Sequence, residues 1–356
     1  MSENLASLGY RMPAEWERQA STWLAWPHNK NDWPGKFQNI PNVFAKIISA
    51  LSKVQKVDLL IQSNKKKKII KKILLNENSK IENVSFHLIK TNRVWTRDSA
   101  PIFLINDKIK KKIIPNFYFN AWAKYKDYQY DNCIKKKISE IKNFEILDIQ
   151  VKIKNKIKNI VLEGGAIDAN GKGTLIVTEE CLLSKIQQRN PGVSKKSLEK
   201  ILSESLNIKN FIWLNKGIIG DDTHGHVDDI TRFYEEDKIF TAIEDNKYDA
   251  NFNSLKHNLK ILEKSVNHNG KNNKITEIPM PKPLIIEKTR VPASYLNFYI
   301  ANNIVLLPIF EDKNDDKAFA ILEKNFKGRK IIPINCKELI WGFGAIHCMT
   351  QQEPFI

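Results

Sequence analysis

The sequence predicts an α/β fold built from repeated units of strands and a helix. Strand-like and amphipathic helical segments alternate along all 356 residues, which is typical of α/β proteins. The strand-like segments come in pairs joined by short turns rich in Asn, Asp and Gly, as in hairpins. Polar residues that open the first strand of successive pairs recur at intervals of roughly 60 residues. We therefore expect five units packed around a pseudo-fivefold axis.

The clearest strand pair spans residues 160–168 and 173–178, because Asn170-Gly171 between them supplies a positive-φ turn. Since the polar loop at 267–274 does not resemble a domain boundary, we expect a single catalytic domain over residues 1–356. The other expected strand pairs are 93–105 with 110–117, 226–234 with 238–243, and 295–300 with 304–308. Helices are expected at 40–54, 65–75, 194–206, 251–265 and 317–326. The polar residues that open the first strands are Asp98, Glu163, His226, Asn297 and Cys348.

Composition argues for a globular protein and against a nucleic-acid partner. Hydrophobic residues make up 42% of the chain and charged residues 27%, as in globular proteins. The formal charge of +17 is typical of a nucleic-acid-binding protein, but only eight of the 57 basic residues are arginine, the usual base-reading cation. We expect solvated lysine faces, and keep a non-catalytic nucleic-acid-binding protein as an alternative.

The chain also carries signals of its cellular setting. It opens without a basic region followed by an apolar run, so no signal peptide is expected. No apolar stretch is long enough for a membrane span. The four cysteines lack paired spacing, which disfavours disulfides and zinc knuckles. We therefore expect a reduced, cytoplasmic protein with no membrane contact.

Cys348 is the best candidate for a reactive side chain. It stands in a polar turn after glycines and is followed by Thr350, Gln351 and Gln352, a composition unlike that of an apolar core strand. A nearby histidine or a bound cation would favour the nucleophilic thiolate. The other three cysteines fit a structural role.

A second cluster, DDTHGHVDD at residues 221–229, contains His226 and Asp228. On a strand these two residues share a face, and a carboxylate beside an imidazole suits it for proton transfer. Two alternatives are open. One is a hydrogen-bonded loop histidine. The other is a metal-dependent amidohydrolase site built from His224, His226 and Asp228.

Asp98 and Glu163 complete the candidate set. Asp98 could instead form a structural pair with the preceding arginine, and Glu163 could cap a turn; two glycines after Glu163 would let a ligand approach. Paired carboxylates grip a planar guanidinium cation and fix its carbon against a thiolate. We therefore expect hydrolysis of a guanidino group through a thiouronium on Cys348. His226 would act as acid and base, and neither metal nor organic cofactor is needed.

Seven segments in this order resemble the agmatine deiminases of the pentein, or guanidino-group-modifying, superfamily, together with bacterial peptidylarginine-deiminase-like proteins. The resemblance covers nearly the whole chain, and the set of segments is highly specific. The segments are MPAEWE (12–17) with WLAWP (23–27), WTRD (95–98), LEGG (162–165), TEECLL (178–183), GHVD (225–228), PASYLNFY (292–299) and IHCMTQQ (346–352).

The resemblance implies a five-bladed α/β propeller with the active site on its central axis. It implies a reaction of agmatine with water to give N-carbamoylputrescine and ammonia, in putrescine synthesis. Cys348 is then the nucleophile and His226 the general acid and base. Asp98 and Asp228 clamp the guanidinium, and Glu163 supports the histidine and the bound cation. Related enzymes also imply a homodimer.

Two further residues are expected to contact the substrate. Trp95 would flank its aliphatic chain, and Asp222 would bind its far amine, with turn capping as the alternative for Asp222. Phe343, Ala345 and His224 depart from the family pattern, in which glycine, asparagine and asparagine are usual. Arginine and peptidyl arginine are therefore alternative substrates. No arginine side chain offers an obvious partner for a substrate carboxylate, and no secretion signal supports a peptidyl substrate.

Overall fold

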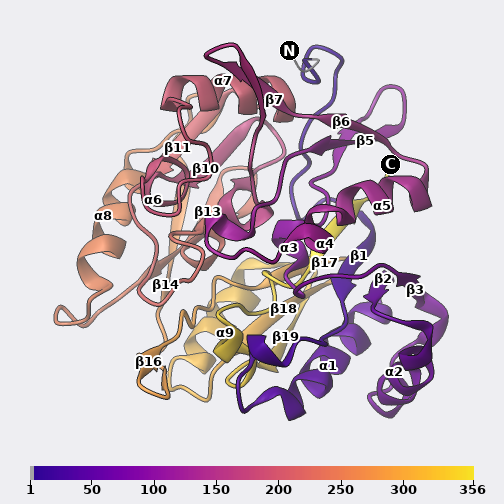
Figure 1. The fold of residues 1–356 in the computed structure, drawn as a ribbon. Helices are drawn as coiled ribbons and strands as arrows, with labels where there is room; N and C mark the ends of the chain where they lie inside the picture. The colour runs from indigo at the N-terminus through magenta and orange to yellow at the C-terminus, as the bar shows by residue number, and fades with distance from the viewer. Residues whose placement is uncertain (1–3) are drawn as a thin grey trace.

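The computed structural model describes residues 4–356 and confirms an α/β fold (Figure 1). Within these residues, five sheets repeat one pattern in which a first strand pairs antiparallel with a second, and the second pairs parallel with a third. The sheets, in strand order, are β4 (Leu104–Asn106), β5 (Lys111–Asn116) and β6 (Glu145–Asp148); β9 (Asp168–Ala169), β10 (Thr174–Thr178) and β11 (Asn210–Leu214); β12 (Thr231–Glu235), β13 (Lys238–Ile243) and β14 (Lys274–Pro279); β17 (Tyr299–Ala301), β18 (Ile304–Ile309) and β19 (Lys330–Asn335); and β20 (Gln351–Pro354), β1 (Gln19–Ala25), β2 (Lys56–Ile61) and β3 (Val84–Leu88).

Each second strand is joined to its parallel third strand through a helix, because parallel neighbours need a crossover connection. In α1 the buried residues Phe44, Ile47, Ile48 and Leu51 follow the spacing of one helix face. The crossover helices are α1 (Ile40–Ser52), α5 (Ile134–Lys142), α7 (Lys195–Leu206), α8 (Phe252–Glu263) and α9 (Asp315–Asn325), and α2 (Asn64–Asn76) joins β2 to β3. The five helices predicted from the sequence are confirmed as α1, α2, α7, α8 and α9, with small shifts at their ends, whereas α5 was not predicted.

The first strands of the hairpins are shorter than predicted. The segment predicted as a strand at 93–105 contains the short helix α3 (Thr96–Ser99) before β4. The strand predicted at 226–234 begins only at Thr231. His224 and Gly225 have φ angles of 66° and 93°, which a strand does not allow. The Asp221 carboxylate accepts hydrogen bonds from the backbone N–H groups of Gly225 and His226, so the segment is held as a turn.

The fifth sheet joins the two ends of the chain. Strand β20 pairs antiparallel with β1, so the segment around Cys348 lies against residues near the amino terminus. Two small hairpins complete the set of strands: β7 (Gln150–Ile153) with β8 (Lys156–Asn159), and β15 (Ile285–Ile286) with β16 (Thr289–Arg290).

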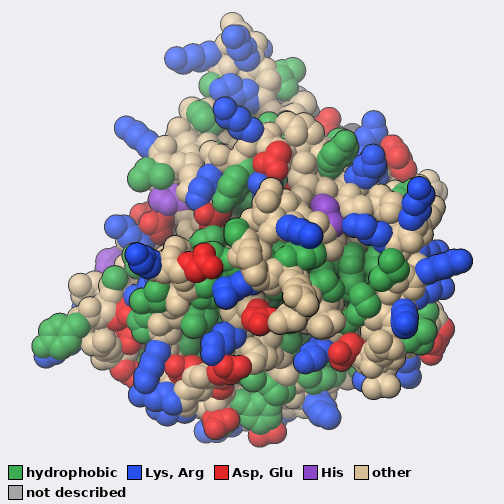
Figure 2. Space-filling model, turned by 60° about the horizontal axis from the view of Figure 1, so that its bottom comes forward, with side chains coloured by type: hydrophobic (Ala, Val, Ile, Leu, Met, Phe, Trp, Pro, Cys, Tyr) green, Lys and Arg blue, Asp and Glu red, His purple; other side chains and the backbone are tan. Residues whose placement is uncertain are grey.

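Buried apolar side chains form a large cluster and a smaller one, the smaller between the β4 and β9 sheets and α7. Lysine and arginine side chains are spread over the face shown in Figure 2 and alternate with acidic ones. No helix among residues 4–356 is both long and apolar enough to cross a membrane.

Candidate active site

The five polar residues predicted to open first strands do not lie in these strands, but each lies shortly ahead of one. Asp98 lies in α3 ahead of β4, Glu163 ahead of β9, and His226 ahead of β12. Asn297 and Cys348 precede β17 and β20. All five are buried, and the distances below show that they meet in one place.

His226 lies among three carboxylates. Its Nδ1 is 3.9 Å from Asp98 Oδ1 and 4.0 Å from Asp228 Oδ1, and its Nε2 is 3.9 Å from Glu163 Oε2. Burial alone would lower the pKa of His226, but the charge of Asp98 and the contacts with Cys181 and Glu163 outweigh burial and raise that pKa well above its usual value. The imidazole therefore favours its protonated form, which suits a proton donor.

Cys348 is held between an amide and an acid. The Asn297 side-chain amide donates a hydrogen bond to Cys348 Sγ at 3.1 Å, and Asp228 Oδ2 lies 3.9 Å from the same sulfur. Burial and the charges of Asp228, Asp229 and Asp98 raise the pKa of Cys348 well above its usual value, against the effect of the Asn297 amide. The thiol is thus protonated in the absence of a cationic ligand. Asn297 was predicted only as a strand opening; nothing in the sequence reasoning assigned it to the thiol.

The Asp98 carboxylate is fixed in place by two donors. The Trp122 indole N–H and the Gly165 backbone N–H each donate to it at 2.9 Å. Burial raises the pKa of Asp98, an effect that the nearby His226 opposes. A Cβ atom on Gly165 would lie 2.6 Å from His226 Nδ1, so this position requires a glycine. The glycine pair after Glu163 therefore makes room for the protein's own side chains.

Glu163 forms an ion pair that the sequence did not predict. Arg189 Nε lies 3.0 Å from Glu163 Oε1, and neither side chain is exposed. Burial tends to raise the pKa of Glu163, but the Arg189 charge and His226 lower it to about 2. Glu163 therefore carries a full charge at neutral pH.

Asp228 is anchored by His347, the residue next to the predicted nucleophile. His347 Nδ1 lies 2.6 Å from Asp228 Oδ2, and its Nε2 lies 2.7 Å from Glu15 Oε2. Glu15 in turn pairs with Arg97 and Arg232 at 3.2 and 2.9 Å. Burial would raise the pKa of Asp228, but the hydrogen bond from His347 lowers it. The sequence signal for this network was the polar composition around Cys348.

A cavity of about 400 Å³ opens onto Cys348 and Asp98. The predicted contact residues Trp95 and Asp222 also line it, whereas His226, Glu163 and Asp228 lie behind this lining. A Cβ on Gly344 would lie 2.7 Å from the Trp95 ring and 3.1 Å from Cys348 Cβ. The glycine thus lets the indole approach the thiol.

The charged residues of the cavity wall are mainly acidic. It contains Asp32, Asp98, Asp127 and Asp222 but a single arginine, Arg93. Contrary to the sequence-based expectation, an arginine does therefore reach the cavity. Its guanidinium is engaged with Asp127 at 2.9 Å and lies 3.8 Å from Asp32.

Asp222 already has partners in its own protein. Tyr125 donates a hydrogen bond to Asp222 Oδ2 at 2.7 Å, and Lys124 pairs with Oδ1. Phe343, one of the departures from the family pattern, lines the cavity with a φ of 64°. That conformation favours glycine, which explains why glycine is usual there.

The metal site predicted as an alternative, from His224, His226 and Asp228, is wrong in its geometry. The segment is not a strand, and His224 Nε2 lies 3.1 Å from Ser184 Oγ. Among residues 4–356 two groups have metal-ligand spacing, namely Glu163 with Cys181 and His226, and Asp228 with Asp229 and Cys348. Neither includes His224.

This fold, with a buried cysteine, a histidine and acids around one cavity, defines a hydrolase of the deiminase class. Residues 11–354 match the sequence profile of the family described as Porphyromonas-type peptidyl-arginine deiminase. The chain belongs to this family, which confirms the resemblance drawn from its motifs.

Relatives and solved structures agree with this assignment. The agmatine deiminase of Pseudomonas aeruginosa is 30% identical, over 97% of this chain and 96% of its own. A protein of Latilactobacillus sakei, provisionally named agmatine deiminase, is 32% identical with the same coverage. The structure of Enterococcus faecalis agmatine deiminase superposes with a TM-score of 0.88 at 28% identity, covering 99% of this chain and 98% of that one. The N-terminal domain of a cyanobacterial arginine dihydrolase shares the fold, with a TM-score of 0.52 at 12% identity, covering 94% of this chain and 99% of that one.

Proposed function

We propose that the protein is an agmatine deiminase that hydrolyses the guanidinium of agmatine to N-carbamoylputrescine and ammonia. The observation that carries the proposal is the placement of the Cys348 thiol beside Asp228 and at one cavity with Asp98. A guanidinium held by these carboxylates would present its carbon to the sulfur. The names of the relatives support the same substrate.

In the proposed first half-reaction, the bound cation lowers the pKa of Cys348, and the thiol releases its proton to solvent. The thiolate forms a C–S bond to the guanidinium carbon, giving a tetrahedral adduct. His226 then donates its proton to one amino group, the C–N bond breaks, and ammonia leaves. Glu163 and Asp98 hold the imidazolium in place for this step. A thiouronium on Cys348 remains.

In the second half-reaction, neutral His226 removes a proton from water as the water oxygen bonds to the thiouronium carbon. Collapse of this second adduct breaks the C–S bond, releases the ureido product and regenerates the thiolate, and the hydroxyl proton of the adduct passes to solvent. His226 and solvent account for the protons in this sequence, so we propose a reaction without a metal or an organic cofactor.

The acidic cavity wall supports a dicationic substrate. Trp95 would pack along the aliphatic chain, and Asp222 would attract the far ammonium while it keeps its contacts with Tyr125 and Lys124. Asp32 is a second carboxylate in this wall, and its Oδ2 is buried without a hydrogen-bond partner. Arg93 could in principle pair with the carboxylate of free arginine as a substrate. Its existing contacts with Asp127 and Asp32 reduce its availability for that role.

We further propose that the five sheets are the blades of a propeller in one domain, with the site on its axis. Their shared strand pattern and the equivalent polar residue ahead of each first strand support this arrangement. A cytoplasmic homodimer that serves putrescine synthesis, without nucleic-acid or membrane partners, is part of the same proposal.

The decisive test is ammonia release from agmatine, free arginine and a blocked arginyl peptide, measured side by side. We expect agmatine to give the highest kcat/KM. Mass spectrometry of protein quenched during turnover should find the thiouronium adduct on the peptide containing Cys348. A preference for arginine or for the peptide would refute the substrate assignment, and an adduct elsewhere would refute the mechanism.

A further inference from the structure

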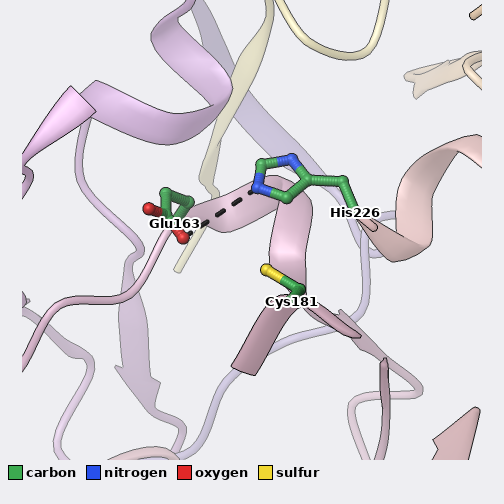
Figure 3. A group of neighbouring side chains, drawn as sticks. All are labelled: Glu163, Cys181 and His226. Carbon is green, nitrogen blue, oxygen red and sulfur yellow. Dashed lines mark ion pairs between the residues drawn. The ribbon is translucent and has the colours of Figure 1, made fainter. Parts of the chain in front are cut away.

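A second buried cysteine lies on the far side of the catalytic histidine. Cys181 belongs to α6 (Glu179–Leu183), and Figure 3 shows its sulfur, the Glu163 carboxylate and the His226 imidazole directed toward a common centre. One ligand atom from each residue lies within 4.8 Å of the other two. All three residues are buried. His226 and Glu163 take part in the proposed reaction, whereas Cys181 has no role in it.

Three buried atoms of Glu163 and His226 lack hydrogen bonds. Glu163 Oε2 and both imidazole nitrogens of His226 are buried without a partner, and the Glu163 to His226 distance of 3.9 Å is too long for a hydrogen bond. Leaving such groups unpaired costs about 1–3 kcal/mol each. These atoms therefore favour a ligand that accepts electron pairs from all three side chains.

We propose that Glu163, Cys181 and His226 form an inhibitory site for a thiophilic divalent cation of the Zn²⁺ type. One carboxylate oxygen, one imidazole nitrogen and one thiolate sulfur are a usual zinc donor set, with a water as fourth ligand. On binding, the Cys181 S–H bond breaks and its proton leaves to solvent, with no change in oxidation state. The proposal rests on the proposed function in one respect: the bound cation inhibits because it occupies the imidazole nitrogen needed for proton transfer.

The second group with metal-ligand spacing, Asp228 with Asp229 and Cys348, is a poorer candidate than the Glu163, Cys181 and His226 centre because of its hydrogen bonds. Asp228 Oδ1 is unpaired, but the Asn297 amide donates to both Asp229 Oδ1 at 2.9 Å and Cys348 Sγ at 3.1 Å. Two of the three residues of that group therefore already share a hydrogen-bond donor. At the Glu163 centre, the Arg189 ion pair uses the other carboxylate oxygen, Oε1, and leaves Oε2 free. Asp98, 3.9 Å from His226, adds negative charge that offsets Arg189.

The binding test uses Co²⁺ as a probe in protein that cannot turn over. In Cys348→Ser protein, Co²⁺ should produce the near-ultraviolet charge-transfer absorption of a cobalt-bound thiolate. Adding Cys181→Ala should abolish it, whereas adding Cys133→Ala, at an exposed cysteine, should not. Absorption that persists without Cys181 would overturn the site. Because this measurement needs no activity, it stands apart from the fate of the proposed function.

The inhibition test uses Zn²⁺ and agmatine. The wild type should lose activity reversibly, with recovery on chelation. Cys181→Ala should retain most of its metal-free turnover and require at least about tenfold more Zn²⁺ for half-inhibition, since one of three ligands is lost. Cys181→Ser, which keeps nearly the same volume, should behave alike if the alanine variant folds poorly. An unchanged half-inhibition concentration in a folded Cys181 variant would refute the proposal.

Discussion

Replacing Asp98 by asparagine should make Cys348 more reactive toward iodoacetamide and the enzyme less active toward agmatine. The two effects have opposite signs because Asp98 acts on two states of the protein. In the ligand-free state its charge raises the pKa of Cys348, so its removal frees thiolate for alkylation. In the proposed complex, the same charge holds the guanidinium, so its removal weakens binding and the chemistry that depends on it.

The size of the loss follows from the geometry. A hydrogen bond between charged partners contributes about 1.5–3 kcal/mol, which predicts a fall in kcat/KM of roughly 10- to 150-fold. At 3.9 Å from His226, the Asp98 charge is also worth roughly 4 kcal/mol to the imidazolium at an effective dielectric constant of about 20. Its loss should therefore shift the alkaline limb of the pH–kcat profile to lower pH, partly offset by Glu163 and Asp228, which remain.

The assay compares alkylation rates without substrate and deimination rates for the wild type, Asp98→Asn and Asp127→Asn. Asp127 is the matched control, because it lines the same cavity but its side chain is 58% exposed and pairs with Arg93. We expect the control to change both rates by no more than about twofold, since exposed charges are screened. Slower alkylation of Asp98→Asn, or an unchanged kcat/KM with a normal Tm, would show that the charge does not couple substrate and thiol.

Three other predictions follow from the site. Cys348→Ser and His226→Ala should lose at least about 100-fold in kcat while circular dichroism and Tm show a folded protein; turnover by Cys348→Ser at the wild-type rate would exclude the covalent route. Asp222→Asn should raise KM for agmatine about tenfold with little change in kcat, as for uniform binding. If KM rises in Asp32→Asn and not in Asp222→Asn, Asp32 rather than Asp222 binds the far ammonium. The pKa of Glu163 falls from about 4.5 to about 2 on folding, so its charge stabilises the folded protein by about 3 kcal/mol above pH 4.5, and this contribution is lost as the pH falls toward 2. In urea unfolding, Glu163→Gln should therefore have a lower free energy of unfolding than the wild type at pH 7 and a smaller difference at pH 3. An equal difference at both pH values would contradict the assignment.

The helices could be predicted because their signal is local. In α1, apolar residues at helical spacing mark the buried face, and the predicted bounds nearly match the observed ones. The Asn170-Gly171 turn was equally local, and Gly171 has the expected positive φ of 72°. The predicted first strands were too long where acidic side chains bind backbone amides. Asp221, for example, holds Gly225 and His226 in a turn, an interaction that apolar-polar alternation does not reveal.

In the candidate site too, residues with a local sequence signal were predicted, whereas their tertiary partners were missed. Cys348, His226 and Asp98 were proposed from polar residues in unusual sequence contexts, and the fold brings them together. Arg189 and Asn297 were missed as partners, because the pairs Arg189–Glu163 and Asn297–Cys348 join segments 26 and 51 residues apart. Nothing in the local sequence distinguishes an arginine that neutralises a buried glutamate from one that faces solvent. Such pairings depend on the tertiary arrangement of the units.

The carboxylates around Cys348 explain why a thiol with a raised pKa can suit the proposed reaction. With the cavity free of cations, the charges of Asp228, Asp229 and Asp98 keep the sulfur protonated, so it is protected from alkylation and oxidation. A bound guanidinium would neutralise part of that negative charge at the place where the thiolate must form. The substrate would then supply the charge that creates its own nucleophile. An isostere of agmatine with a neutral head group, such as its ureido product, cannot do this. It should therefore not accelerate the alkylation of Cys348 at any pH. A small, unreactive guanidinium compound should accelerate alkylation, provided that it does not block access to the sulfur.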